Sequence, residues 1–268
     1  LVLKIDTSGA IVDSLIITEY ATCRLLNIHF YNNELYILAM VKENENNQLK
    51  LGLFRYNTDL DFLDLKLNYM PIDVSISSLN SIIDTDENII ICGDGLPPIN
   101  FYYKMSIAGD SITSKFFSST IQKVPMGIIE NKNLDGYHAL IRNHTNGWSS
   151  IVNLNKNLDI IDTLIFGNGT MLPDSLYKTY FVSPASMTDG SLFASGIHKG
   201  MYNFNGIFLT KISSSDSIVK KRYIESTTLT NHAIYYSNSS YNDNYYTAYT
   251  SNFTNQTAFS NDTSHIHV

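Results

Sequence analysis

Apolar and polar residues alternate along most of the chain, in short runs that are separated by polar turns. The segment LFRYNTDLDFLDL at residues 53–65 is typical, because two alternating runs flank the polar residues Asn57 to Asp59. Alternation with a period of two is the pattern of a half-buried β-strand, and a short polar break between two such runs predicts a hairpin. Related hairpin segments occur at residues 3–15, 54–65, 103–116, 152–164 and 210–222.

A second pattern, a polar turn followed by an apolar strand, precedes most of these hairpins by about twenty residues. Asp, Asn and Gly in it favour tight turns. Its copies lie at residues 32–39, 84–93, 133–141, 188–196 and 242–249. A further strand candidate precedes each copy, at residues 24–31, 74–83, 123–130, 178–187 and 231–237. One period therefore contains four predicted strands, which we name A to D in chain order.

Four antiparallel strands in a repeating unit predict an all-β fold, a β-propeller whose four-stranded blades stack face to face. The C–D hairpins align on Lys4, Arg55, Lys104, Asn153 and Lys211, which are about 50 residues apart. Another β-repeat array or a β-sandwich is the alternative, although a sandwich would not repeat the same two patterns in the same order. The predicted blades are residues 24–67, 73–118, 123–166, 178–224, and 231–250 together with 1–17.

The last of these blades joins the two ends of the chain. Residues 231–250 supply strands A and B, and residues 1–17 supply strands C and D, so that pairing of the terminal strands leaves no open edge. This predicts one domain over residues 1–268 with five blades. The segment SHIHV at 264–268 lies where another strand C would begin, so the alternative is a fragment of a propeller with six to eight blades.

Two segments carry a resemblance to a known class of repeats. TDGSLFASG at 188–196 and LKIDTSGAIVDSL at 3–15 resemble the blade hairpins of secreted bacterial β-propeller repeat proteins. Other copies depart from that pattern, since Arg142 stands where Gly93 and Gly196 stand elsewhere. The resemblance implies binding or scaffolding roles in a secreted or cell-surface protein, outside the cytoplasm, and names no ligand.

Composition narrows the partners. The net charge is −7 and only 16% of residues are charged, which argues against a nucleic-acid partner because phosphates require a basic patch. No apolar run approaches the ~18 residues of a membrane helix, so no membrane span is expected. The two cysteines, Cys23 and Cys92, are interpreted as unpaired thiols, because Cys92 lies in an apolar strand and no disulfide framework is implied. A disulfide or other thiol chemistry is the alternative.

Candidate binding residues lie in the connections between strands B and C, whose lengths and residues differ between blades. Such variation on one face indicates that this face binds a ligand, although relaxed constraint on surface loops would give the same pattern. An exposed aromatic side chain such as that of Trp148 is suited to a sugar ring or a protein partner. The candidate ligand-binding residues are Asp94, His144, Trp148, His198, Lys199 and Tyr202.

The sequence offers no complete set of catalytic or metal-binding residues. Glycoside hydrolysis needs two carboxylates ~5 to 10 Å apart, and strand A offers Glu130 and, where it begins, Asp73, with Asp84 and Asp86 expected on the opposite rim. DTDEN at 84–88 lacks the later ligands of a calcium loop. His265 and His267 lack a third metal ligand. We therefore name no catalytic residue, metal or cofactor.

These patterns favour a non-catalytic, exported or cell-surface propeller that binds a protein or a glycan through its variable loop face. A carbohydrate-active enzyme, a glycosidase or lyase on a five-bladed scaffold, is one alternative. An intracellular protein-docking platform is the other. The oligomeric state is left open.

Overall fold

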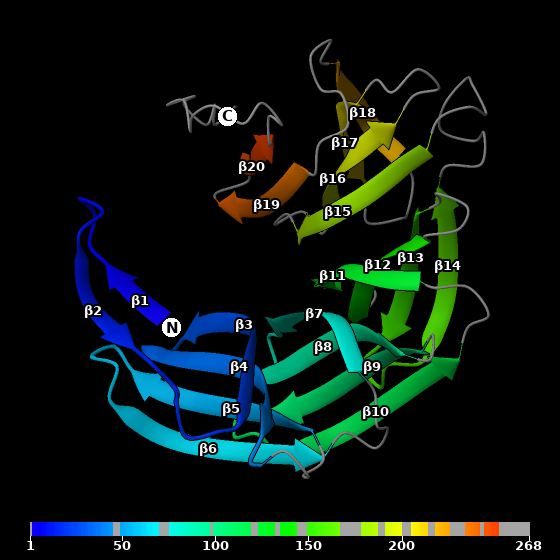
Figure 1. The fold of residues 1–268 in the computed structure, drawn as a ribbon. Coiled ribbons are helices and arrows are strands. Elements are labelled where there is room, and N and C mark those ends of the chain that lie inside the picture. The colour runs from blue at the N-terminus through cyan, green and yellow to red at the C-terminus, as the bar shows by residue number, and fades with distance from the viewer. Residues whose placement is uncertain are drawn as a thin grey trace.

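A computed structural model describes most of the chain, and all regular secondary structure in the described residues is β-strand (Figure 1). The described residues are 2–44, 49–69, 75–96, 99–118, 123–131, 135–143, 149–166, 178–186, 191–199, 205–213, 218–225, 234–241 and 244–251. Within these ranges there is no helix of the length and apolar character needed to cross a membrane.

Four antiparallel sheets of four strands each follow one another along the chain. The first contains β3 (Thr22–Tyr31), β4 (Glu34–Lys42), β5 (Lys50–Asn57) and β6 (Phe62–Tyr69). The second contains β7 (Ser75–Ile83), β8 (Asn88–Leu96), β9 (Ile99–Ser106) and β10 (Ser111–Ser118). The third contains β11 (Lys123–Asn131), β12 (Gly136–Asn143), β13 (Ser149–Asn155) and β14 (Ile160–Phe166). The fourth contains β15 (Lys178–Ser186), β16 (Leu192–Lys199), β17 (Asn205–Ile212) and β18 (Ile218–Glu225).

These sheets are arranged side by side around a common centre, with strands β3, β7, β11 and β15 innermost (Figure 1). The predicted all-β propeller of four-stranded antiparallel blades is confirmed. We call the sheets the first to fourth blades and keep the names A to D for their strands. Each strand pairs with the next one along the chain, so the strand order from the centre outward is A, B, C, D.

The two ends of the chain form separate two-stranded sheets. β1 (Val2–Ile5) pairs with β2 (Ile11–Leu15), and β19 (Ile234–Tyr241) pairs with β20 (Asn244–Ser251). β19 contacts β15 and so continues the row of inner strands. No ladder joins β20 to β1 among the described strands, so closure at five blades remains a prediction.

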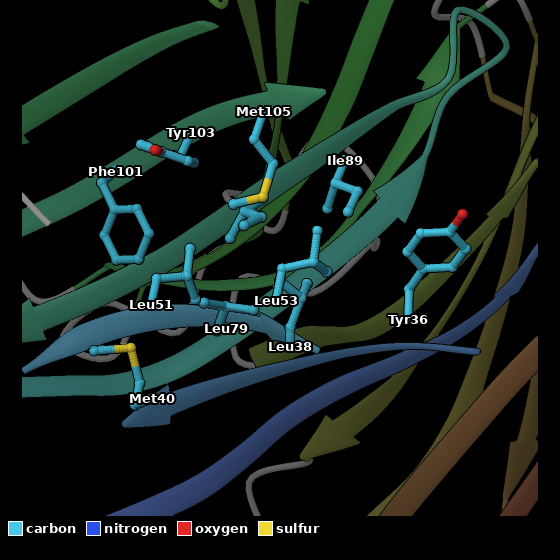
Figure 2. Packing of buried hydrophobic residues seen from close by; sticks show 11 residues of the cluster. Tyr36, Leu38, Met40, Leu51, Leu53, Leu79, Ile89, Phe101, Tyr103 and Met105 are labelled. Atoms are coloured by element: carbon cyan, nitrogen blue, oxygen red, sulfur yellow. The ribbon is translucent and has the colours of Figure 1, made fainter. Parts of the chain in front are cut away.

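The core lies between blades rather than within them. Figure 2 shows Leu38, Leu51 and Leu53 of the first blade packed against Ile89 and Phe101 of the second. Each of these side chains is fully buried. A single sheet cannot cover both of its own faces, so the alternation along each strand is satisfied only when neighbouring blades stack.

Three of the described C–D turns share one geometry, which explains the polar residue at their start. In the first blade the Asn57 side-chain oxygen accepts hydrogen bonds from the backbone N–H groups of Asp59 and Asp61, both at 2.9 Å. Leu60 then adopts a left-handed conformation with φ of 63°. Asp6 and Asn155 make the same pair of bonds in their own turns.

Candidate functional site: a charged cluster beside a central hollow

The residues predicted on the variable loop face are only partly described. Asp94 was expected in the connection between strands B and C of the second blade, but β8 extends to Leu96, and Asp94 is buried within it between Ser78 and Asn100. The placement in a loop was wrong because ladder pairing continues through the glycines on either side. His198 and Lys199 are the last residues of β16. His144, Trp148 and Tyr202 lie outside the described residues, and a ligand-binding role for all six stays a prediction.

A charged cluster instead forms at the opposite ends of the strands, between the second and third blades. It begins with Asp84 in the A–B turn of the second blade, whose Oδ1 accepts the backbone N–H groups of Asp86 and Asn88 at 3.0 and 2.8 Å. Glu87 takes the left-handed conformation that this turn needs, with φ of 59°. The turn thus buries the Asp84 carboxylate completely and aims its second oxygen at the third blade.

That second oxygen, Oδ2, accepts a hydrogen bond of 2.6 Å from the Tyr137 hydroxyl on β12. Lys104 Nζ, on β9, lies 3.9 Å from the same oxygen and also donates to the Tyr137 hydroxyl. Lys104 Nζ donates further to the backbone carbonyl of Lys156 at 3.3 Å. Two blades therefore hold the buried carboxylate, the third through the Tyr137 hydroxyl and the second through the Lys104 ammonium group.

Lys156, in the C–D turn of the third blade, joins three carboxylates. Its Nζ lies 2.8 Å from Asp86, 2.9 Å from Glu130 and 3.9 Å from Asp84. Glu130 also accepts from the Thr85 hydroxyl at 2.6 Å and from the Thr85 backbone N–H at 3.1 Å. The Lys156 ammonium occupies the space between these carboxylates, and within the described residues no three His, Cys, Asp or Glu side chains are grouped as metal ligands.

The cluster shifts the pKa of its members in different directions. Burial raises the pKa of Tyr137, and the hydrogen bond to Asp84 raises it further. The Lys156 ammonium lowers the pKa of Asp86 by hydrogen bonding and charge. Burial alone lowers the pKa of Lys156, but its hydrogen bonds to Asp86 and Glu130 outweigh this and leave the pKa raised. At neutral pH the lysine is charged and the tyrosine is a neutral hydrogen-bond donor.

An open hollow of about 460 Å³ lies beside the cluster at the A–B end of the inner strands. Tyr31 is one of its lining residues, and the Tyr31 hydroxyl donates to Glu87 at 3.1 Å. Thr85 and Glu130 present polar atoms, and three isoleucines supply the apolar surface. The hollow is lined by Tyr31, Ile82, Ile83, Asp84, Thr85, Ile129 and Glu130.

The sequence reasoning missed this convergence for one reason. It placed Glu130 on strand A and Asp84 on the opposite rim, but Glu130 is the last residue but one of β11 and therefore lies at the same end as the A–B turns. Asp86 and Glu130 both contact Lys156 Nζ, so their carboxylate oxygens lie within about 6 Å of each other, the scale of a glycosidase pair. Because strand A runs toward the A–B turn, a carboxylate near the end of strand A is expected beside that turn, and this direction would have predicted the pair.

A second polar contact links the inner strands next to the hollow. His29 Nε2 on β3 lies 2.7 Å from the Ser81 hydroxyl on β7, and Asn27 Nδ2 donates to the same hydroxyl at 2.9 Å. Burial lowers the pKa of His29 from 6.5 to about 4. A neutral imidazole is therefore built into the contact between the first two blades.

Comparisons with known proteins give structural neighbours only. No protein-family model and no curated protein matches the sequence. A Bacteroides caccae protein of unknown function is similar over 82% of this chain and 87% of its own, at 10% identity and a TM-score of 0.43. The β-propeller domain of the Trilobed protease from Pyrococcus furiosus is similar over 87% of this chain and 79% of its own, at 6% identity and a TM-score of 0.40.

Proposed function

We propose that this chain is a non-catalytic binding propeller, exported or on the cell surface, that recognises a sugar unit of a glycan in the central hollow. The hollow falls within the ~300–1,000 Å³ of small-ligand sites. Tyr31 lines the hollow with an aromatic ring, and the Thr85 hydroxyl oxygen, whose hydrogen is donated to Glu130, can still accept a hydrogen bond from a sugar hydroxyl. The observation that carries the proposal is that the neighbouring acids and bases are already engaged with one another, as ion pairs across the blade interface.

One observation favours a second function, a glycosidase. The carboxylates of Asp86 and Glu130 lie close enough for acid–base work. A general acid in such a pair has a raised pKa, however, whereas Lys156 lowers the pKa of Asp86. Glu130, only 12% exposed, is held by Thr85 and Lys156. Binding therefore fits the geometry better than hydrolysis.

The test uses the whole chain against a panel of plant, bacterial and animal glycans, with binding measured by calorimetry and turnover by release of reducing ends. We expect saturable binding to at least one class without turnover. Thr85→Val removes a hydroxyl from the hollow at little change in shape and should weaken binding about ten-fold, the value of one lost hydrogen bond to a sugar. Thr58→Val, in the exposed C–D turn of the first blade, is the matched control.

Three results would overturn the proposal. Absence of binding across the panel would show that the ligand is not one of these glycans. Equal affinity of Thr85→Val and Thr58→Val would show that the ligand does not bind in the hollow. A loss of binding on Trp148→Ala, with Thr85→Val unaffected, would move the site to the variable loop face. Turnover that disappears with both Asp86→Asn and Glu130→Gln would establish the glycosidase instead.

A further inference from the structure

Every C–D hairpin carries one extra residue in strand D. In the first blade Tyr56 pairs with Phe62 and Arg55 with Asp64, so Leu63 has no partner on strand C and forms a β-bulge. The same one-residue shift occurs in β2, β10, β14 and β18. The bulged residues are Val12, Leu63, Ile112, Ile161 and Val219. All five are aliphatic, although a bulge by itself requires no particular side chain.

The described bulge residues are not part of the core. Val12, Leu63, Ile112 and Ile161 are between 46 and 58% exposed. A bulge re-aims the side chain that it carries, and here it turns an aliphatic group outward at the same place in successive blades. The preceding residue is exposed and apolar in three hairpins, as Ile11, Phe62 and Ile160. Exposed apolar groups repeated in this way mark an interaction surface more strongly than scattered ones do.

Strand D is also the outer edge of each sheet. β6, β10, β14 and β18 each pair with strand C on one side only, and β2 is likewise the outer member of its hairpin. An edge strand presents backbone N–H and C=O groups that another extended segment can pair with. The bulged aliphatic residue therefore stands at the beginning of an edge that has no partner strand on its outer side among the described strands.

Acidic residues follow the bulge directly in three hairpins, as Asp13, Asp64 and Asp162. Each carboxylate accepts the backbone N–H of the next residue, at 2.7 to 2.8 Å. No ion pair joins any of the three within the described part of the chain. Thr113 and Lys220 stand at this position in the other two hairpins. Three of the five edges thus combine an exposed aliphatic residue with a negative charge.

We propose that these edges dock an extended peptide segment of a partner protein that carries aliphatic and basic residues in alternation. We call the bulge residues with the residues on either side of them the outer rim. The partner segment adds to strand D as a fifth strand, its aliphatic residues cover the bulge residues, and its lysines or arginines pair with the aspartates. The repetition makes the rim multivalent. This surface lies at the outer edge of the blades, and its use does not depend on the hollow.

The probe is an acetylated, amidated peptide of alternating valine and lysine, labelled with a fluorophore, and binding is followed by fluorescence polarisation. The triple variant Val12→Ser, Leu63→Ser and Ile161→Ser should weaken binding about ten-fold, because each affected edge loses one aliphatic contact. Leu3→Ser, Ile16→Ser and Leu25→Ser together form the control, since these exposed side chains lie outside strand D. A second triple variant, Asp13→Asn, Asp64→Asn and Asp162→Asn, should reduce both the affinity and its dependence on salt.

Saturable binding that the rim variants weaken and the control retains would support the proposal. Equal affinities for the rim and control variants, or equal binding of a peptide with glutamate in place of lysine, would overturn it. Sedimentation of the wild type provides the remaining outcome. If the wild type is a dimer and the aliphatic triple variant is a monomer, the outer rim binds a second copy of this chain. That result would also overturn the proposal.

Discussion

Replacing Lys156 with methionine tests whether the charged cluster holds the second and third blades together. The substitution keeps an unbranched side chain as far as Cε and removes the ammonium group shared by Asp84, Asp86 and Glu130. Breaking a buried ion pair by removing one partner costs ~3–5 kcal/mol. The Lys156 side chain is 21% exposed, and Lys104 and Thr85 still serve Asp84 and Glu130, so we expect a loss of about 3 kcal/mol, at the lower end of that range.

Lys115→Met is the matched control because Lys115 crosses the same blade interface. Its ammonium lies 2.6 Å from Asp159, a shorter contact than any that Lys156 makes, but the two side chains are 36 and 50% exposed. A surface pair of this kind contributes ~0 to 1 kcal/mol whatever its distance. Urea denaturation at pH 7, followed by tyrosine fluorescence and circular dichroism, gives both free energies of unfolding with their m-values.

The physical cause is tested by the double variant Lys156→Met with Glu130→Gln. If the loss comes from carboxylates left without a counter-charge, neutralising Glu130 should recover part of it, at least about 1 kcal/mol. A loss below about 1 kcal/mol for Lys156→Met, or one equal to that of Lys115→Met, would refute the reasoning. Further destabilisation by Glu130→Gln would show that packing of the lysine stem, and not its charge, is what matters.

Three further predictions concern single positions. Leu60→Gly should stabilise the chain by about 0.5 to 1 kcal/mol, because glycine relieves the left-handed backbone at this position. Leu158→Gly should instead cost at least about 2 kcal/mol, because the Leu158 side chain is fully buried. Paired urea titrations measure both changes in the free energy of unfolding. The pKa of His29 is lowered to about 4, so between pH 7 and pH 5 the unfolded state takes up a proton that the folded state does not, and stability should fall by about 2 kcal/mol. His29→Asn should flatten this dependence of the unfolding free energy on pH. An unchanged dependence would show that His29 is not its cause. Burial raises the pKa of Cys92 to about 12, so a thiol reagent should modify only the partly buried Cys23 until the chain unfolds, and rapid reaction of both thiols in the native protein would contradict this burial.

Strands and turns could be predicted from the sequence because their causes are local. The alternation over 53–65 places the first C–D hairpin, and Asn57 at its start supplies the side-chain oxygen that closes the turn. The bulge at Leu63 could not be read from the same pattern, because an extra residue in one strand looks like a small change in turn length. It becomes visible only when the register against strand C is known.

The candidate site depends on contacts between blades, which no local pattern encodes. Lys156 meets Asp86 across 70 residues of chain and Glu130 across 26. These residues come from a C–D turn, an A–B turn and the end of a strand A, so their meeting requires the stacking geometry of two blades. Sequence periodicity supplies the order of the elements but not the offset between neighbouring sheets.

The anchor position of the C–D hairpins makes different contacts in different blades. In the first blade Arg55 stays within its own sheet and pairs with Glu34 at 2.7 Å. In the third blade Asn153 also stays within its sheet, where it accepts from His138 at 2.6 Å. Lys104, at the same position in the second blade, instead reaches the neighbouring blade and joins the charged cluster. Lys4, at this position in the terminal hairpin, also reaches a neighbouring sheet, where its Nζ donates to the Thr58 carbonyl oxygen of the first blade at 2.7 Å. Of these two links between sheets, the one that Lys104 makes lies at the junction that borders the hollow. A junction reinforced in this way keeps the walls of the hollow in a fixed relation, which is what a preformed ligand site requires.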